Sequence, residues 1–144
     1  MVREATNQDV DILADLAILM WTNDTLEDLK AKFNNVIKKD DTVFFLFYKS
    51  EQPIGFSQCQ LRYDYVEGTE SSPVGYLEGI FVIKEFRNNG YARSLLRECE
   101  KWAKSKGCKE FASDCELINE TSLSFHINMG FAEVNRIICF TKKL

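Results

Sequence analysis

Hydrophobic residues recur along the chain with two different periods, and the alternation between these periods predicts the order of helices and strands. Leu26, Leu29 and Phe33 repeat every three or four positions, which places them on one face of a helix. Residues 43–48 form a continuous apolar run of strand length, and residues 74–83 combine strand length with alternation. The other expected elements are strands at residues 3–6, 54–63, 109–115 and 131–141, and helices at residues 6–21, 92–107 and 119–130.

This order of elements, β-α-α-β-β-β-α-β-α-β, describes a mixed α/β domain with a central sheet and helices on both faces. The length of 144 residues matches one domain. No linker, repeat or low-complexity tract interrupts the chain. We therefore expect residues 1–144 to fold as a single domain.

An acidic residue interrupts the strand expected at residues 74–83. Simple alternation assigns Glu78 to the same face as four apolar or aromatic residues, where a charge is out of place. In the strand expected at residues 54–63, the hydrophobic phase slips between Phe56 and Cys59, which indicates a β-bulge. The face predicted to carry the acidic residue consists of Val74, Tyr76, Glu78, Ile80 and Val82.

Composition excludes several classes of protein. Hydrophobic residues make up 45% of the chain and charged residues 28%, which is ordinary usage for a globular protein. The longest strongly apolar run, residues 43–48, is far shorter than the ~20 residues of a membrane-spanning helix. The first residues show no secretion signal, so we expect a cytoplasmic protein without a membrane partner. The five cysteines form no CxxC pair and His126 is the only histidine, which argues against a zinc cluster.

The net charge of −4 is distributed unevenly. Residues 63–82 and 111–135 each contain four acidic residues and no Lys or Arg, so the two segments together carry −8 and the rest of the chain +4. If both segments border one cleft, they form an electronegative wall that attracts a cationic ligand and repels nucleic acid. The alternative is a solvated acidic face without a binding role.

Residues 87–92 form a glycine-containing turn between an expected strand and an expected helix. Such a turn leaves unpaired backbone N–H groups at the helix N-terminus, which suit a phosphate group. Gly90 lets the backbone approach a ligand closely, and Ala92 keeps the next turn compact. Neither GxxxxGK[ST] nor GxGxxG occurs, so the turn predicts neither a nucleoside triphosphatase nor a Rossmann dinucleotide site. On these residues alone, an ordinary strand-to-helix turn is the alternative.

The turn and its surroundings carry a resemblance to a known family. The matching residues are Arg87, Gly90 and Ala92 of an R-x-x-G-x-A motif, the preceding run 82–87, Asn119, Met129, Gly130 and Phe131. In this combination the chain resembles the Gcn5-related N-acetyltransferases over essentially its whole length. Residues 62–69 and 73–82 are further similar to the aminoglycoside 6'-N-acetyltransferase branch of that family.

This resemblance implies a fold and a cofactor site. The implied fold is a mixed sheet in which acetyl-CoA is held where two parallel strands splay apart. The backbone of one strand would follow the pantetheine arm, and the glycine-containing turn would surround the pyrophosphate. No metal takes part in the implied reaction. The implied acetyl-CoA contacts are Ile80, Phe81, Val82, Arg87, Asn88, Asn89, Gly90, Tyr91, Ala92, Arg93 and Asn119.

On the acceptor side, the resemblance implies a pocket for a small cationic amine. Trp21 and Tyr65 would stack on a sugar ring, although a tryptophan at the end of an apolar helix is also typical of a core. Glu78 and Asp114 would bind ammonium groups, and both belong to the segments without Lys or Arg. The two arguments therefore point to one cleft. Asn135 stands where this branch tends to have a further acidic residue, so we expect weaker attraction for an aminoglycoside, or an acceptor with fewer amines.

The expected chemistry is a proton transfer followed by acyl transfer. An acceptor ammonium must lose its proton before it attacks a thioester. Glu78 is the first candidate for the base, because its strand would also supply the N–H that holds the developing oxyanion, and Asp114 is the second. The alternative is that Glu78 only pairs with the ammonium and that water takes the proton. His126 stands where many members of the wider family have a tyrosine that protonates the leaving thiolate; a histidine stabilised by the helix dipole is the alternative.

We therefore expect an N-acetyltransferase that transfers acetyl from acetyl-CoA directly to a small cationic amine, the 6'-amine of an aminoglycoside being the first choice. The same chemistry on a polyamine or a protein amino group is one alternative. A non-catalytic acyl-CoA-binding regulator is another. The resemblance also implies a homodimer with the edge of the last strand as its contact, and we expect no nucleic-acid partner.

Overall fold

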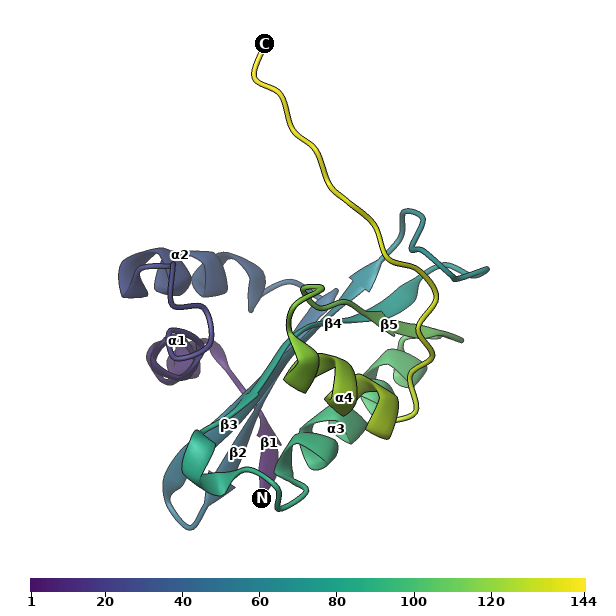
Figure 1. Ribbon diagram of the computed structural model, residues 1–144. Coiled ribbons are helices and arrows are strands. Elements are labelled where there is room, and N and C mark those ends of the chain that lie inside the picture. Colours follow the sequence, from purple (N-terminus) through teal and green to yellow (C-terminus); the bar gives the residue numbers. More distant parts are fainter.

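A five-stranded sheet runs through the protein, whose computed structural model describes residues 1–144 (Figure 1). Neighbouring strands follow chain order, the first three pairings are antiparallel, and the last is parallel. The mixed sheet expected from the sequence is therefore confirmed. The strands are β1 (Val2–Glu4), β2 (Thr42–Lys49), β3 (Gln52–Arg62), β4 (Val74–Val82) and β5 (Phe111–Ser113).

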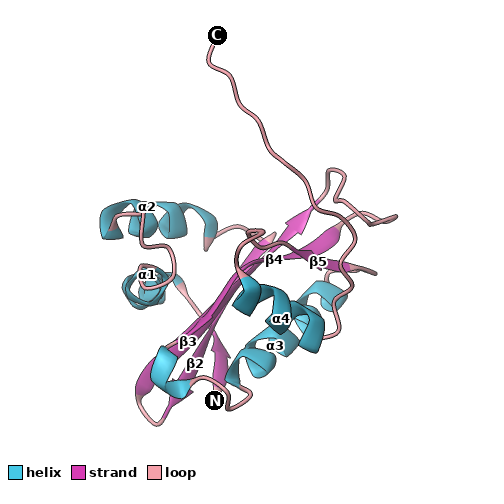
Figure 2. Ribbon diagram, in the orientation of Figure 1, coloured by secondary structure: helices cyan, strands magenta, loops and turns pink.

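Helices cover both faces of this sheet, as Figure 2 shows. The first two α-helices lie on one face, where Phe33, Phe44 and Phe56 are completely buried. The last two lie on the other face, where Leu95 and Cys99 are completely buried. None of the helices combines the length and apolar character needed to cross a membrane. The helices are η1 (Asn7–Asp9), α1 (Val10–Ala17), α2 (Leu26–Val36), η2 (Lys84–Phe86), α3 (Tyr91–Ser105) and α4 (Glu120–Asn128), with η marking 3-10 turns.

Side-chain caps fix the starts of three helical segments. The backbone N–H of Thr6 donates to the Asp9 carboxylate at 2.8 Å, which closes a capping box at η1. Thr25 accepts from the backbone of Asp28 at the start of α2, and Asn119 accepts from the backbone of Ser122 at the start of α4. The expected helix at residues 6–21 is shorter than predicted, because η1 occupies its first turn and α1 ends at Ala17.

The strand predicted at residues 131–141 is wrong for this structure. Residues 131–144 form neither helix nor strand. The first part of the segment passes along the body, where Asn135 contacts Glu67, and its end runs away from the body of the protein (Figure 1). Ile137, Ile138 and Phe140 are 71%, 80% and 87% exposed. The hydrophobic alternation that suggested a strand is present in these residues. A strand also needs a neighbouring strand for its backbone hydrogen bonds, and none of the strands β1 to β5 pairs with residues 131–144.

Candidate active site

A β-bulge at Glu78 interrupts the regular alternation of β4. Gln58 of β3 pairs with Gly79, but Cys59 pairs with Leu77, so Glu78 is an extra residue without a partner. A bulge of this kind twists a strand and redirects a side chain. The irregularity predicted between Phe56 and Cys59 is therefore present between Gln58 and Cys59, although the extra residue belongs to the neighbouring strand.

The bulge also corrects the predicted faces of β4. Tyr76 and Glu78 lie on the face toward α1 and α2, but beyond the bulge Ile80 and Val82 pack on the opposite face with α3. Simple alternation assigned all four residues to one face. One extra residue reverses the phase of every position that follows it. Glu78 keeps the face of Tyr76 and borders a hollow there, whereas Ile80 and Val82 pack in the apolar layer under α3.

Glu78 borders a hollow of about 300 Å³ between β3, β4 and the α1–α2 region. Trp21 and Glu78 were predicted for the acceptor pocket, and both line this hollow. Asp24, Lys32 and Gln58 were not predicted, because nothing in their local sequence marks them. A larger depression of about 770 Å³ includes Lys106 but none of the predicted site residues. The residues that line the smaller hollow are Trp21, Asp24, Lys32, Phe33, Gln58 and Glu78.

Trp21 is both a wall of the hollow and part of the core. Its ring meets Phe33 and Phe56 with centroids 6.4 and 6.1 Å apart. A Cβ atom placed on Gly79 would lie 2.9 Å from the indole, so only glycine at this position of β4 lets the ring lie directly on the strand. The two interpretations of Trp21 made from the sequence are therefore compatible.

Arg62 holds the Glu78 carboxylate through two hydrogen bonds. Its Nε donates to Oε1 and one terminal nitrogen donates to Oε2, each at 3.0 Å. The guanidinium carbon lies 3.4 Å from the ring centroid of Tyr76, and the Tyr76 hydroxyl donates a short hydrogen bond to Asp114. These contacts link the two carboxylates predicted from the sequence through an arginine and a tyrosine that the sequence did not indicate.

The pKa of Glu78 reflects three competing influences. Burial raises it above the ordinary value for a glutamate, the guanidinium of Arg62 lowers it, and the like charge of Asp114 raises it again; the net direction is upward. A carboxylate with a raised pKa is a better proton acceptor near neutral pH. Burial and the hydrogen bond to Asp114 also raise the pKa of Tyr76, which keeps that hydroxyl a donor.

The predicted anion site has the expected backbone. Asn88 and Gly90 have φ angles of 63° and 79°, and the first intrahelical bond after the turn runs from the Ser94 N–H to the Gly90 carbonyl. The amides before Ser94 therefore precede the hydrogen-bonded ladder of α3. A Cβ atom on Gly90 would meet no heavy atom within 4 Å. The turn thus has open space beside Gly90, at the point where these amides begin the helix.

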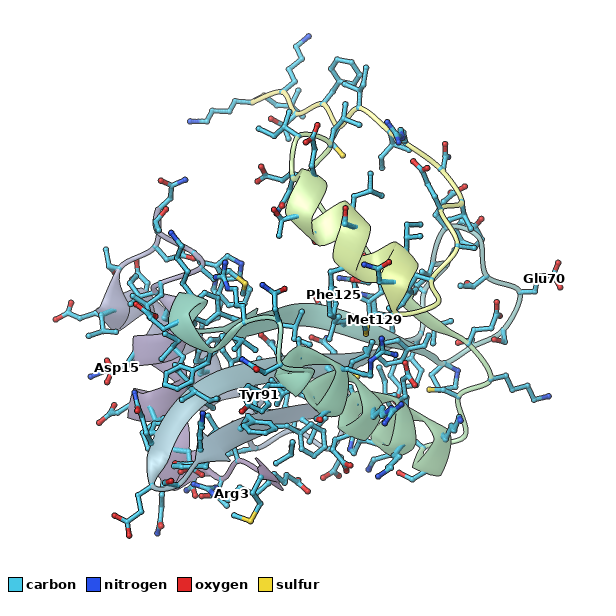
Figure 3. All side chains as sticks on the ribbon, turned by 60° about the horizontal axis from the view of Figure 1, so that its bottom comes forward. Arg3, Asp15, Glu70, Tyr91, Phe125 and Met129 are labelled. Atoms are coloured by element: carbon cyan, nitrogen blue, oxygen red, sulfur yellow. The ribbon has the colours of Figure 1, made fainter.

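Two side chains of the turn, those of Arg87 and Asn89, hold its shape by hydrogen bonds to the backbone. The Nε of Arg87 donates to the carbonyl of Val82 at 2.8 Å, and its guanidinium lies over the Phe81 ring. The Asn89 amide donates to two backbone carbonyls at 3.0 Å. Figure 3 labels Tyr91 in this region; its ring packs on Phe47, with centroids 4.5 Å apart. These contacts engage the Asn89 amide and the Nε of Arg87, and the backbone N–H groups before Ser94 stay outside the helical ladder.

The parallel strands separate next to this turn. Pairing between β4 and β5 ends with Leu77 and Ser113, so the edge of β4 from Glu78 to Val82 has no strand beside it on that side. His126 of α4 reaches the end of β5, where its Nε2 lies 2.7 Å from the Ser113 hydroxyl. Its Nδ1 lies 2.7 Å from the Ser122 carbonyl, which can only accept, so Nδ1–H donates there and Nε2 is the nitrogen that meets the Ser113 hydroxyl.

Three predicted residues lie outside the hollow. Tyr65 is 76% exposed, and Asp114 is exposed and reaches Glu78 only through Tyr76 and Arg62. Asn135 belongs to the C-terminal segment and donates to Glu67 at 3.2 Å. Of the residues predicted for the acceptor pocket, Trp21 and Glu78 therefore line the hollow, and Tyr65, Asp114 and Asn135 lie outside it.

A splayed parallel strand pair, a bulge beside the splay and an amide-lined turn at the start of α3 define an acyl-transfer enzyme of the Gcn5-related type. Residues 10–131 match the acetyltransferase (GNAT) family, and the chain belongs to this family. Individual relatives within this family are similar over the whole length of the chain. The chain is 34% identical over 143 residues to an aminoglycoside N(6')-acetyltransferase type 1 of Acinetobacter haemolyticus, with 99% of this chain and 98% of that protein covered.

Two further similar proteins carry the same kind of name, one of them with a solved structure. The identity is 33% over 145 residues to an aminoglycoside N(6')-acetyltransferase type 1 of Serratia marcescens, with 100% and 99% of the two chains covered. The solved structure of AAC(6')-Iy in complex with the bisubstrate analogue CoA-S-monomethyl-acetylneamine superposes with a TM-score of 0.95 at 32% identity. That comparison covers 100% of this chain and 98% of the other. The family resemblance and the fold class expected from the sequence are confirmed.

Proposed function

We propose that this protein transfers an acetyl group from acetyl-CoA to the 6'-amine of an aminoglycoside. The observation that carries the proposal is the position of Glu78: this half-buried carboxylate is the bulged residue of β4, it borders a hollow walled by Trp21, and the edge of its strand is free beyond the splay. Aminoglycosides are cationic sugars, and a carboxylate beside an aromatic ring suits an ammonium group on a sugar. The named activity of the relatives supports the same substrate.

The residues of the turn fit the diphosphate of coenzyme A. Amides at the start of α3 suit an anion, and the open space beside Gly90 leaves room for it. The free edge of β4 at Ile80, Phe81 and Val82 offers backbone groups to the pantetheine amides. The side chains of Asn88 and Arg93 are exposed beside the turn, and the Asn119 amide group lies at the start of α4. Acetyl-CoA supplies the acetyl group that is transferred.

Glu78 has the environment of a general base. An amine with a pKa near the lysine value of ~10.4 is almost entirely protonated at neutral pH, so a proton acceptor must stand beside it. Each oxygen of Glu78 accepts one hydrogen bond from Arg62 and retains a lone pair for the acceptor ammonium. Asp114 stays the second candidate, acting through the Tyr76 hydroxyl, and a water held by Glu78 is the remaining route.

His126, with both ring nitrogens protonated, is proposed to supply a proton to the leaving thiolate through the Ser113 hydroxyl. The hydroxyl would give its proton to the thiolate as it takes the proton of Nε2–H, which leaves the ring neutral with its proton on Nδ1. We expect His126→Ala to lower kcat by about 10-fold, less than the ~10²-fold or more of a typical general acid, because a thiol with a pKa near 8.5 already leaves readily. Steady-state kinetics measure this. Ile127→Ala, a change at an exposed neighbour on α4, is the control. An unchanged kcat in His126→Ala would assign the ring a structural role.

The acceptor itself is tested by a panel of amines. We expect release of CoA thiol with kanamycin, and NMR of the product should show acetylation at the 6' nitrogen. Lys32 lines the hollow, and Asn135 offers no charge, so the affinity for a polycation should be moderate. If the protein acetylates spermidine or a lysine peptide but not kanamycin, the acceptor is a polyamine or a protein amino group and not an aminoglycoside. Binding of acetyl-CoA without any turnover would indicate an acyl-CoA-binding regulator.

A homodimer is also part of the proposal. The apolar residues of the C-terminal segment are exposed, and the outer edge of β5 has no strand beside it. An unpaired edge and an unpaired apolar segment favour pairing with a second copy. We expect a mass of two chains in analytical ultracentrifugation and dissociation in the variant Ile138→Asp/Phe140→Asp. Ile118→Asp, at an equally exposed residue outside the segment, should stay dimeric; a monomeric unaltered protein would overturn this part.

A cytoplasmic location completes the proposal. All five cysteines are free, and Cys115 and Cys139 are exposed. Exposed thiols persist in a reducing compartment, where acetyl-CoA is also available.

A further inference from the structure

Arg62 is a cation beside a hollow whose proposed ligand is also a cation. Its guanidinium lies between the Tyr76 ring and the Glu78 carboxylate, with 41% of its side chain exposed and 21% of the glutamate side chain exposed. A positive charge at this point reduces the attraction for an ammonium group. We therefore expect Arg62 to make a contribution to the reaction that offsets this weaker attraction.

We propose that Arg62 is a positioning residue that keeps Glu78 ionised and fixes the plane of its carboxylate toward the acceptor amine. This inference rests on the proposed function, because it assigns Arg62 a part in the proton transfer to Glu78. No residue of β3 was expected to take part in the reaction.

Orientation is the first support. A guanidinium that donates to both carboxylate oxygens fixes the plane of the carboxylate, which a single hydrogen bond would not do. Stacking on Tyr76 holds the guanidinium, and the bond from Tyr76 to Asp114 holds the ring. The chain of contacts from Asp114 to Glu78 therefore sets the direction of the lone pairs that remain free.

Charge is the second support. Glu78 is half-buried and shares its surroundings with Asp114, and both conditions favour the protonated acid. Arg62 opposes them from β3. The other groups that face Glu78 are Tyr76 of β4, Gln58 of β3, Asp24 before α2 and Lys32 on α2. Lys32 has no ion pair with Glu78, so Arg62 is the cation in direct contact with it.

Two substitutions separate these roles. Arg62→Gln removes the charge and keeps a hydrogen-bonding group, whereas Arg62→Lys keeps the charge but loses the two-point bond. Arg97→Gln, at an exposed arginine of α3, is the matched control. Thermal melting and acetyl-CoA affinity establish that each variant is folded.

The first measurement needs no substrate. Carbon-13 NMR of protein labelled at glutamate carboxyl groups reports the titration of Glu78, which the variant Glu78→Gln assigns. We expect the Glu78 midpoint to rise by about one pH unit or more in Arg62→Gln and to stay near its original value in Arg62→Lys and Arg97→Gln. An unchanged midpoint in Arg62→Gln would overturn the inference.

The second measurement is the pH profile of kcat/KM with kanamycin. We expect its acidic limb to move upward with the Glu78 midpoint in Arg62→Gln, and kcat of Arg62→Lys to fall about 10-fold without movement of the limb. A limb that stays in place in Arg62→Gln, with only a lower melting temperature, would overturn the inference and leave Arg62 a structural role. If the unaltered protein acetylates no amine, the proposed function fails, and the NMR titration alone decides the effect of Arg62 on Glu78.

Discussion

Glu78→Gln is expected to lower kcat with kanamycin by about 10²- to 10⁴-fold, the usual contribution of a positioned general base. Glutamine keeps the size of the side chain and an oxygen that accepts from Arg62, but it cannot take a proton from the acceptor ammonium. Acetyl-CoA binding should stay close to that of the unaltered protein, because the amides of the turn before α3 lie on a different element. Steady-state kinetics and calorimetry measure the two quantities.

The control for this substitution is Glu51→Gln, which makes the same change at an exposed residue of the turn between β2 and β3. Its kcat should not change. A large loss of acetyl-CoA affinity in Glu78→Gln with normal turnover would contradict the assignment of Glu78 as the base. A loss smaller than that of Asp114→Asn would transfer this role to Asp114.

Gly90→Asp is expected to weaken acetyl-CoA binding by about 100-fold, which is ~2.8 kcal/mol. The new carboxylate would lie beside the amides at the start of α3 and compete with the diphosphate for them. Like charges also repel the ligand. Calorimetry with acetyl-CoA measures the loss.

The same helix supplies the control. Gly107 follows the end of α3, has a φ of 87°, and a Cβ there would also meet nothing within 4 Å. Gly107→Asp introduces the same strain and charge at the C-terminal end, where the helix dipole disfavours a negative charge. We expect Gly90→Asp to be the more stable of the two variants and yet the one that loses acetyl-CoA. Equal losses of affinity in both would show that the amides before Ser94 do not hold the diphosphate.

Much of the fold followed from the sequence because its signals are local. The spacing of Leu26, Leu29 and Phe33 identified α2, and the helix expected at residues 119–130 begins where the Asn119 side chain caps α4 in the structure. Each signal depends on residues within one or two turns, so no knowledge of neighbouring strands was needed.

The charge pattern identified the acidic side of the site but not its cation. The segment without Lys or Arg begins at residue 63, directly after Arg62. A count along the chain therefore placed this arginine outside the segment, whereas pairing of β3 with β4 places it against Glu78. Lys32 was missed for the same reason, because α2 reaches the hollow only after the helices pack on the sheet.

The sequence by itself determined the order of the elements from β1 to α4 and the turn at Gly90, because each depends on neighbouring positions. Tertiary structure alone decided that Glu78 is the bulged residue, that Arg62 and Tyr76 connect it to Asp114, and that Ser113 meets His126. It also decided that residues 131–144 find no strand to pair with in their own chain. These features depend on which strands become neighbours and in what register, and hydrophobic periodicity along one strand does not fix either.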